Sequence, residues 1–301
     1  MTTARRPQLG LLAVAVFFIS TSAPIIAATQ APALAIAFWR TALGAALTAP
    51  WTLTRHLSEL RALSRRQWWL CAAGGGLLAA HFATWIPSLR FTSVASSTAL
   101  VATQPVWAAL LARARGVLFP RRVWLGIAVA LAGIAVLTGV DVALDARSLI
   151  GDALALVGAM LAAAYVTVGE AARRDVSTPT YTLIAYSSSA IALLPVCLLG
   201  GVALAGYPTS AWVLIVALTL LAQLLGHSLI NATLRTTSAT VTSMGILFEM
   251  PIATILAALF LGQWPPAAVL PALVLLLVGV AIVVRAGAGS TASATLAESP
   301  T

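Results

Sequence analysis

Ten long apolar stretches constrain the fold of this chain more than any other feature of its sequence. A helix needs about 20 apolar residues to cross the hydrocarbon core of a bilayer. Of the 301 residues, 60% are hydrophobic and only 8% are charged, whereas soluble domains carry about 25% charged residues. We therefore expect an all-α polytopic membrane protein with ten transmembrane helices. The predicted spans are 9–29, 33–53, 68–89, 94–112, 123–140, 152–172, 179–200, 211–233, 237–261 and 266–284.

The basic residues predict the orientation of these helices. All seventeen are arginines, and cytoplasmic segments of membrane proteins are enriched in Lys and Arg. With the N-terminus inside, Arg147, Arg40 and Arg90 lie in or near outer segments, and both termini are expected in the cytoplasm. The cytoplasmic arginines are then Arg5, Arg6, Arg55, Arg61, Arg65, Arg66, Arg113, Arg115, Arg121, Arg122, Arg173, Arg174, Arg235 and Arg285.

The two halves of the chain resemble each other. The segment "LRFTSVASSTALVATQPVWAALLA" (89–112) returns as "LRTTSATVTSMGILFEMPIATILAA" (234–258), and Gly133 matches Gly279. Because each half has an odd number of helices, the second half must enter the membrane upside down relative to the first. Inverted repeats of this kind place a substrate site near mid-membrane between the halves. We predict repeats at 1–146 and 147–287, followed by a disordered cytoplasmic tail at 288–301.

These segments also carry a family resemblance that extends over essentially the whole chain. The L-R-x-T-S pattern with "PVWAALLA", the second copy ending "LFLGQ", "LIGDALALVGAMLAAAYV" (149–166) and "AFWR" (37–40) resemble the EamA type of the drug/metabolite transporter superfamily. The resemblance implies two inverted five-helix halves in a bacterial inner membrane. It also implies export of small metabolites, nearest to a bacterial aromatic amino-acid exporter. The usual Glu-Pro pair of the ninth helix is here Glu249-Met250-Pro251, which departs from the family pattern.

Three hydrogen-bonding side chains recur in the eighth predicted helix. Gln223, His227 and Asn231 follow one another at every fourth residue, so on an α-helix they share one face. Polar groups are costly in lipid, and such a face is expected to turn inward. We predict that it lines a substrate cavity; the alternative is hydrogen bonding between helices.

The third predicted helix has a comparable face. His81, Thr84, Trp85 and Ser88 lie at i, i+3, i+4 and i+7. Trp85 can stack on an apolar substrate group or bind a cation over its ring. We predict that His81, Trp85 and Ser88 line the cavity; the alternative is ordinary core packing.

Two further polar residues lie beside prolines within helices. Gln104 and Glu249 occupy corresponding places next to Pro105 and Pro251, and a mid-helix proline kinks a helix and frees a carbonyl. Glu249 can accept a substrate ammonium or carry a coupling proton, or it can pair with an arginine and hold shape.

The remaining candidates lie in the first, second and sixth predicted helices. Ser20 and Pro24 suggest a broken first helix, where Ser20 is a candidate for the cavity wall. Tyr165 shares a face with Gly158 and is predicted to line the cavity. Arg40 can hold a substrate carboxylate in bidentate geometry, but snorkelling to the outer interface is the favoured interpretation.

Other features exclude several functions. The chain has no lysine, which rules out Walker-type ATP hydrolysis and a lysine Schiff base. Its cysteines and histidines form no metal-ligand pattern in the sequence. We expect that the protein binds no metal, no cofactor and no nucleic acid, and that it is not an enzyme. The predicted function is a secondary carrier that exports amino acids by alternating access, with membrane lipids as partners and with proton or counter-substrate coupling left open. The alternatives are export of drugs or nucleotide-sugar-like metabolites, and an intramembrane enzyme.

Overall fold

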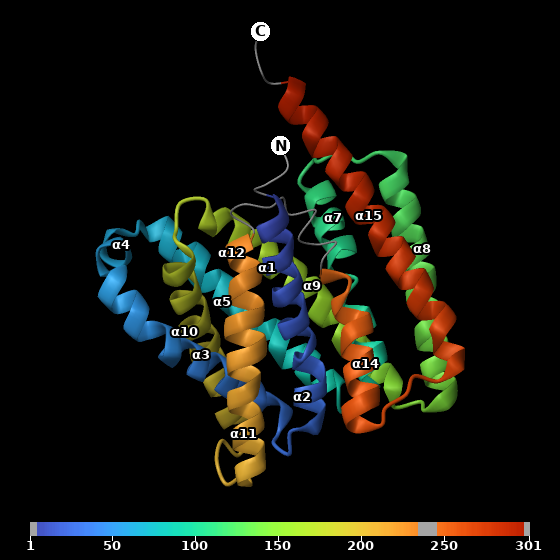
Figure 1. The fold of residues 1–301 in the computed structure, drawn as a ribbon, viewed down its shortest axis with the longest axis horizontal. Helices are drawn as coiled ribbons and strands as arrows, with labels where there is room; N and C mark the ends of the chain where they lie inside the picture. The colour runs from blue at the N-terminus through green and yellow to red at the C-terminus, as the bar shows by residue number, and fades with distance from the viewer. Residues whose placement is uncertain (1–4, 234–245, 298–301) are drawn as a thin grey trace.

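The computed structural model describes residues 5–233 and 246–297, and side chains over 10–230 and 246–286. All regular structure in these ranges is helical (Figure 1). The elements are α1 (Arg5–Ser20), α2 (Ser22–Ala28), α3 (Ala33–Arg55), α4 (Leu57–Ala62), α5 (Arg65–Ser88), α6 (Val94–Val101), α7 (Gln104–Ala114), α8 (Arg121–Leu144), α9 (Ser148–Arg173), α10 (Thr178–Leu199), α11 (Thr209–Leu218), η1 (Thr219–His227), α12 (Ser228–Thr233), α14 (Glu249–Leu261), η2 (Ala267–Val269) and α15 (Leu270–Ala297).

Nine helical stretches of the described chain are long and apolar enough to cross a membrane, and they confirm nine predicted spans to within a few residues. They are Gly10–Ala28, Ala33–Arg55, Arg65–Ser88, Val94–Ala114, Arg121–Leu144, Ser148–Arg173, Thr178–Leu199, Thr209–Ile230 and Ala267–Ala286. The predicted span 237–261 begins outside the described residues, and its described part is the shorter apolar helix Glu249–Leu261.

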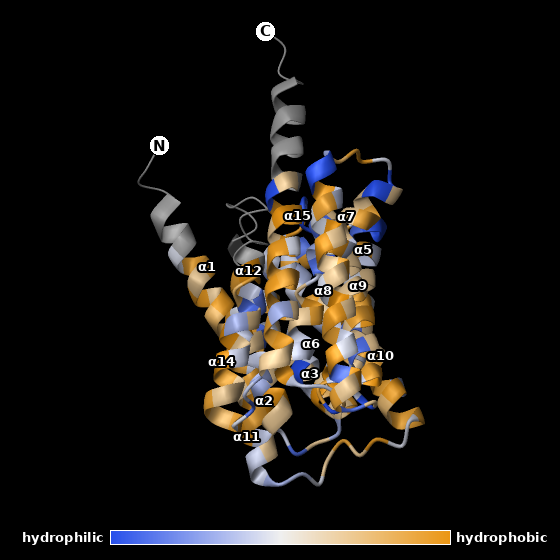
Figure 2. Ribbon diagram, turned by 90° about the vertical axis from the view of Figure 1, so that its right-hand side faces the viewer, coloured by the Kyte–Doolittle hydropathy of each residue, from blue (hydrophilic) through white to orange (hydrophobic). Residues whose placement is uncertain are grey.

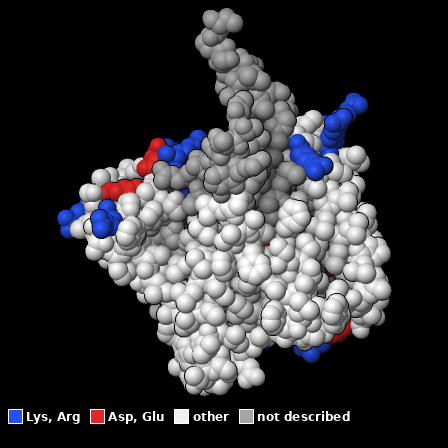
Figure 3. Space-filling model, in the orientation of Figure 1, with Lys and Arg blue, Asp and Glu red and all other residues white. Residues whose placement is uncertain are grey.

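The distribution of side chains matches a bilayer environment. The middle of the bundle is orange in Figure 2, where apolar residues dominate, and blue residues gather toward the helix ends and at interior points. On the face shown in Figure 3, the charged side chains lie near the two ends of the helices and leave the middle free of charge. The start of α1 and the end of α15 lie at the same end of the bundle (Figure 1).

Several spans are broken or wound differently near their middle. Thr21 interrupts the first span between α1 and α2, with Pro24 inside α2. A turn at Ala102–Thr103 separates α6 from α7, and Pro105 is the second residue of α7, where a missing amide donor costs nothing. Pro251 similarly lies in the first turn of α14. The eighth span changes from α-helix to the π-helix η1, a winding that often occurs at functional sites.

The helices α8 and α15 pack through glycines at equivalent positions of the two halves. A Cβ atom on Gly133 would lie 2.9 Å from the backbone nitrogen of Leu276, and one on Gly279 would lie 2.4 Å from that of Ala130. Each contact therefore repeats the other with the helices exchanged. Gly126 lies against Val283, so residue numbers rise along α8 as they fall along α15, and the two helices are antiparallel.

The last helix extends further than the predicted span. The end of the second repeat was expected at residue 287, whereas α15 continues to Ala297. Five of the ten added residues, in "AGSTASATLA" (288–297), are alanine or leucine, which have high helix propensity. The other five are glycine, serine or threonine, which favour a helix less.

Candidate functional site

The centre of the candidate site is a fully buried arginine on α3. The Arg40 side chain donates to the Gln223 amide oxygen from Nε at 2.9 Å and from Nη2 at 2.7 Å. Its Nη1 donates to the Ser22 hydroxyl at 3.3 Å, and its guanidinium carbon lies 4.0 Å from the centre of the Phe82 ring. Residues from α2, α3, α5 and η1 thus meet around one positive charge.

This position corrects the interpretation of Arg40 as a snorkelling residue. The side chain would need to reach the outer interface, but none of its surface is accessible. Arg40 lies seven residues after the start of α3, about 10 Å along the helix. Snorkelling looked favourable because a sequence does not show what faces a side chain, and here Gln223, Ser22 and Phe82 offer hydrogen bonds and a ring at that depth.

The π-helix η1 presents Gln223 to Arg40. The backbone N–H of Ser228 donates to the Gln223 carbonyl, five residues earlier, as π-helical winding requires. The Tyr186 hydroxyl donates to the same carbonyl at 3.2 Å. Within the described chain, the Gln223 amide nitrogen is buried and has no hydrogen-bond partner. Close packing of α1 on η1 depends on Gly226, where a Cβ atom would lie 2.9 Å from the Ile19 nitrogen.

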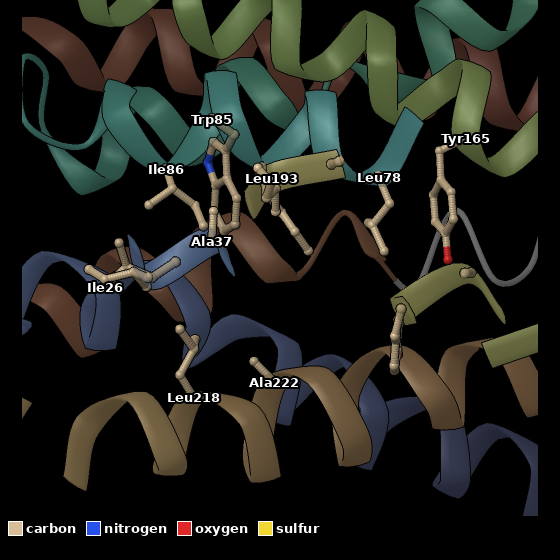
Figure 4. Close-up of a cluster of buried hydrophobic side chains, with 14 of the residues drawn as sticks. Ile26, Ala37, Leu78, Trp85, Ile86, Tyr165, Leu193, Leu218 and Ala222 are labelled. Carbon is tan, nitrogen blue, oxygen red and sulfur yellow. The ribbon is translucent and has the colours of Figure 1, made fainter. Parts of the chain in front are cut away.

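Aromatic rings form one wall of the cluster. The His81 and Trp85 rings stack at 5.6 Å with an interplanar angle of 8°, and the His227 ring approaches Phe82 edge-on at 6.3 Å. His81 Nδ1 lies 2.9 Å from the Gly158 carbonyl oxygen, which fixes the imidazole against α9. In Figure 4 Trp85 extends from α5 toward Ala37 on α3. The Trp85 indole nitrogen is buried and has no partner in the described part of the chain.

Glu249 is the first residue of α14. Its carboxylate is close enough to Arg40 for the two charges to attract each other, although the described residues show no salt bridge between them. Gln104 opens α7 and is half-buried; no contact described for it reaches Arg40.

Ser20 and Ser88 bond to groups other than Arg40. The Ser20 hydroxyl donates to the Val16 carbonyl of its own helix, and Ser88 bonds to Ser97 at 2.7 Å, joining α5 to α6. Tyr165 is buried at the opposite end of the apolar cluster from Ile26 (Figure 4). The Asn231 side chain lies outside the described side chains.

Sequence reasoning missed three residues that shape the site. Ser22 and Phe82 contact the Arg40 guanidinium, and Tyr186 supports Gln223. A signal existed for Tyr186, which opens the polar run "YSSS" (186–189) within an apolar helix. The sequence held no such signal for Phe82, because phenylalanine is common in membrane helices and the cation that faces its ring comes from another helix.

An apolar pocket of about 350 Å³ lies beside α2. Thr21, Pro24 and Ile25 of α1–α2 line it, together with Leu214 of α11 and Phe260 of α14. The short helix α2 thus lines this pocket and also contributes Ser22 to the Arg40 cluster.

Comparisons with known proteins agree with this architecture. The family described as "EamA-like transporter family" matches this chain over residues 7–139 and again over residues 149–285. No curated protein matches the chain. The chain is also similar to a protein of known crystal structure. The two superpose over 93% of this chain and 97% of the other chain, with a TM-score of 0.65 and 17% sequence identity. A likeness at that identity concerns the fold alone.

Proposed function

The chain belongs to the EamA-like transporter family, and we propose that it is a secondary carrier that exports small zwitterionic metabolites, amino acids in particular. In this proposal the substrate binds beside Arg40 and crosses by alternating access. The protein would lie in a bacterial inner membrane with both termini in the cytoplasm, as its arginine distribution favours.

The observation that carries the proposal is the environment of Arg40. A buried guanidinium is costly unless an anion and hydrogen-bond acceptors compensate it. Its hydrogen-bond partners, Gln223 and Ser22, are both neutral, and Glu249 interacts with it electrostatically but forms no salt bridge with it among the described residues. A substrate carboxylate would add a directly bonded anion in bidentate geometry. The buried Gln223 amide nitrogen and Trp85 indole nitrogen are further donors for such a group.

The other parts of the cluster suit the rest of an amino acid. Glu249 lies near enough to Arg40 to interact with it, and its carboxylate would accept the substrate ammonium. The stacked rings of His81 and Trp85 offer a flat surface to an aromatic or apolar side chain. A nucleotide sugar fits less well, because its phosphates require several cations and Arg40 is the cation of this cluster in the described chain.

Alternating access is supported by the contacts between α8 and α15. Two antiparallel helices whose equivalent glycines make reciprocal contacts are related by an approximate two-fold axis perpendicular to both helices. Inverted repeats have an axis in this direction, in the membrane plane. Since the chain lacks a Walker lysine, transport would follow the substrate gradient or be coupled to a proton or counter-substrate.

The test is uptake of labelled amino acids by liposomes that contain the purified protein, first without an ion gradient and then with a pH gradient. We expect saturable uptake, with aromatic and large neutral amino acids preferred. Arg40→Lys should lower kcat/KM about 10- to 100-fold, because an ammonium cannot reproduce charge-assisted hydrogen bonds worth about 1.5–3 kcal/mol.

The matched control is Arg285→Lys, the same change at an exposed arginine of α15, which should transport normally. Normal uptake by Arg40→Lys would contradict the proposed site. Failure to move any amino acid under either condition, with uptake of drugs or nucleotide sugars instead, would overturn the proposed substrate class.

A further inference from the structure

A second polar cluster lies where α6, α8 and α9 meet, away from Arg40. Asp141 lies in the last turn of α8 and Asp152 in the second turn of α9. Thr92 precedes α6, Ser96 lies in its first turn, and Thr138 lies on α8. This is the junction between the two segments that match the family, since α8 and α9 are consecutive helices on either side of it.

The two carboxylates are buried and face hydroxyl groups. Asp152 is 1% exposed and Asp141 is 7% exposed. The hydroxyls of Ser96 and Thr92 face Asp141. The hydroxyls of Thr92 and Thr138 face Asp152, which is also repelled by the nearby Asp141 carboxylate. Even so, neither Asp152 oxygen has a partner with normal hydrogen-bond geometry among the described residues, and the same holds for Asp141 Oδ2 and for the hydroxyls of Thr92 and Thr138.

No described arginine compensates these carboxylates. Nearby in sequence, Arg147 is exposed and lies over the Phe91 ring at 6.0 Å, and Arg90 donates to the carbonyls of Thr29 and Ala31. Within the described chain, no salt bridge involves either aspartate. A buried carboxylate without a partner destabilises the folded protein, so such groups pair with or coordinate cations.

We propose that Asp141 and Asp152, together with the hydroxyls of Thr92, Ser96 and Thr138, bind a sodium ion. The donor atoms are all oxygens, the ligands that hard cations prefer, and none is a nitrogen or sulfur. Asp141 and Asp152 interact with each other, and two neighbouring carboxylates disfavour carrying two charges at once. With a proton on one of them a single negative charge remains, and one monovalent cation compensates it.

Sodium at this place would tie together α6, α8 and α9. The chain is already tight there, because a Cβ atom on Gly151 would lie 2.8 Å from the backbone nitrogen of Thr92. The helix α6 also packs against α14, whose first residue is Glu249. The ion would therefore stabilise the arrangement of α6 that supports one side of the Arg40 cluster.

The test is the melting temperature of the purified full chain in detergent, measured in NaCl, KCl, CaCl2 and choline chloride at matched ionic strength. Since the readout involves no substrate, its failure and a failure of the transport proposal are distinguishable. We expect a saturable rise of the melting temperature with Na+ that K+ and choline do not produce. Asp152→Asn should raise the half-saturating Na+ concentration about tenfold or more, because ligand charge sets affinity at oxygen sites.

The matched control is Asp145→Asn, at an exposed aspartate of the neighbouring loop, which should keep the wild-type response. If Asp152→Asn does not fold, Thr138→Val provides the same comparison through a hydroxyl ligand, and radioactive Na+ binding to the wild type should still reach one ion per chain. The proposal is overturned by a wild type that Na+ does not stabilise, by an unchanged response in both variants, or by a response to Ca2+ and not to Na+.

Discussion

At the residue scale, Glu59 of α4 shows how one side chain outside the membrane holds a helix end. Its carboxylate accepts the Ser177 backbone N–H at 2.6 Å and the Thr180 hydroxyl at 2.7 Å, at the start of α10. Burial alone would raise the pKa of Glu59, but the hydrogen bonds from Ser177 and Thr180 and the nearby His56 hold it below its ordinary value. A carboxyl group with a lowered pKa stabilises the fold above its unfolded pKa, and this stabilisation is lost as pH falls through the folded pKa.

We therefore predict that Glu59→Gln destabilises the protein at pH 7 by about 1 kcal/mol, as loss of a helix cap does. The effect is small because the side chain is 27% exposed. Below about pH 4 the wild type should lose the same contribution, and the two proteins should converge. Melting curves from pH 3 to 7 check this, with Glu170→Gln, an exposed glutamate of α9, as control. A constant difference between wild type and Glu59→Gln down to pH 3 would contradict the argument.

At the element scale, the contact between α8 and α15 depends on glycines, at whose positions there is no room for a side chain. We predict that Gly279→Leu lowers stability by about 1–3 kcal/mol or more, because its Cβ atom would lie 2.4 Å from the Ala130 backbone nitrogen and backbone cannot move aside cheaply. Gly139→Ala, on the same helix as Ala130 but with nothing within 4 Å, should gain up to about 1 kcal/mol of helix propensity. Melting temperatures in detergent measure both changes. Equal melting temperatures for wild type and Gly279→Leu would show that this contact does not hold the two helices.

At the scale of the whole molecule, the orientation in the membrane can be tested by cysteine labelling in intact cells. Cys71 and Cys197 are buried, so their background reaction should be low. We predict that Ala146→Cys, in the exposed loop between α8 and α9, reacts with an impermeant maleimide added outside. Leu118→Cys, exposed between α7 and α8, should react only after permeabilisation. The reverse pattern would place both termini outside.

The sequence by itself determined the helical spans, because crossing a bilayer depends on the hydropathy of about 20 consecutive residues and this is a local property. It also singled out Gln223, His81 and Trp85, since polar and large aromatic groups in lipid need a reason to be there. The repeat also paired Gly133 with Gly279, and these two glycines make reciprocal contacts between α8 and α15. The residues that each of these side chains and glycines contacts were not predictable from the same local evidence.

Only the tertiary structure decided what surrounds each buried charge. Arg40 faces Gln223 across 183 residues of chain, and Asp141 faces Asp152 only because α8 and α9 pack side by side at their connected ends. Phe82 became a site residue when α3 placed a guanidinium over its ring. The free energy of a charge in a membrane protein depends on the groups within a few ångströms of it, and those groups come from helices that are distant in sequence.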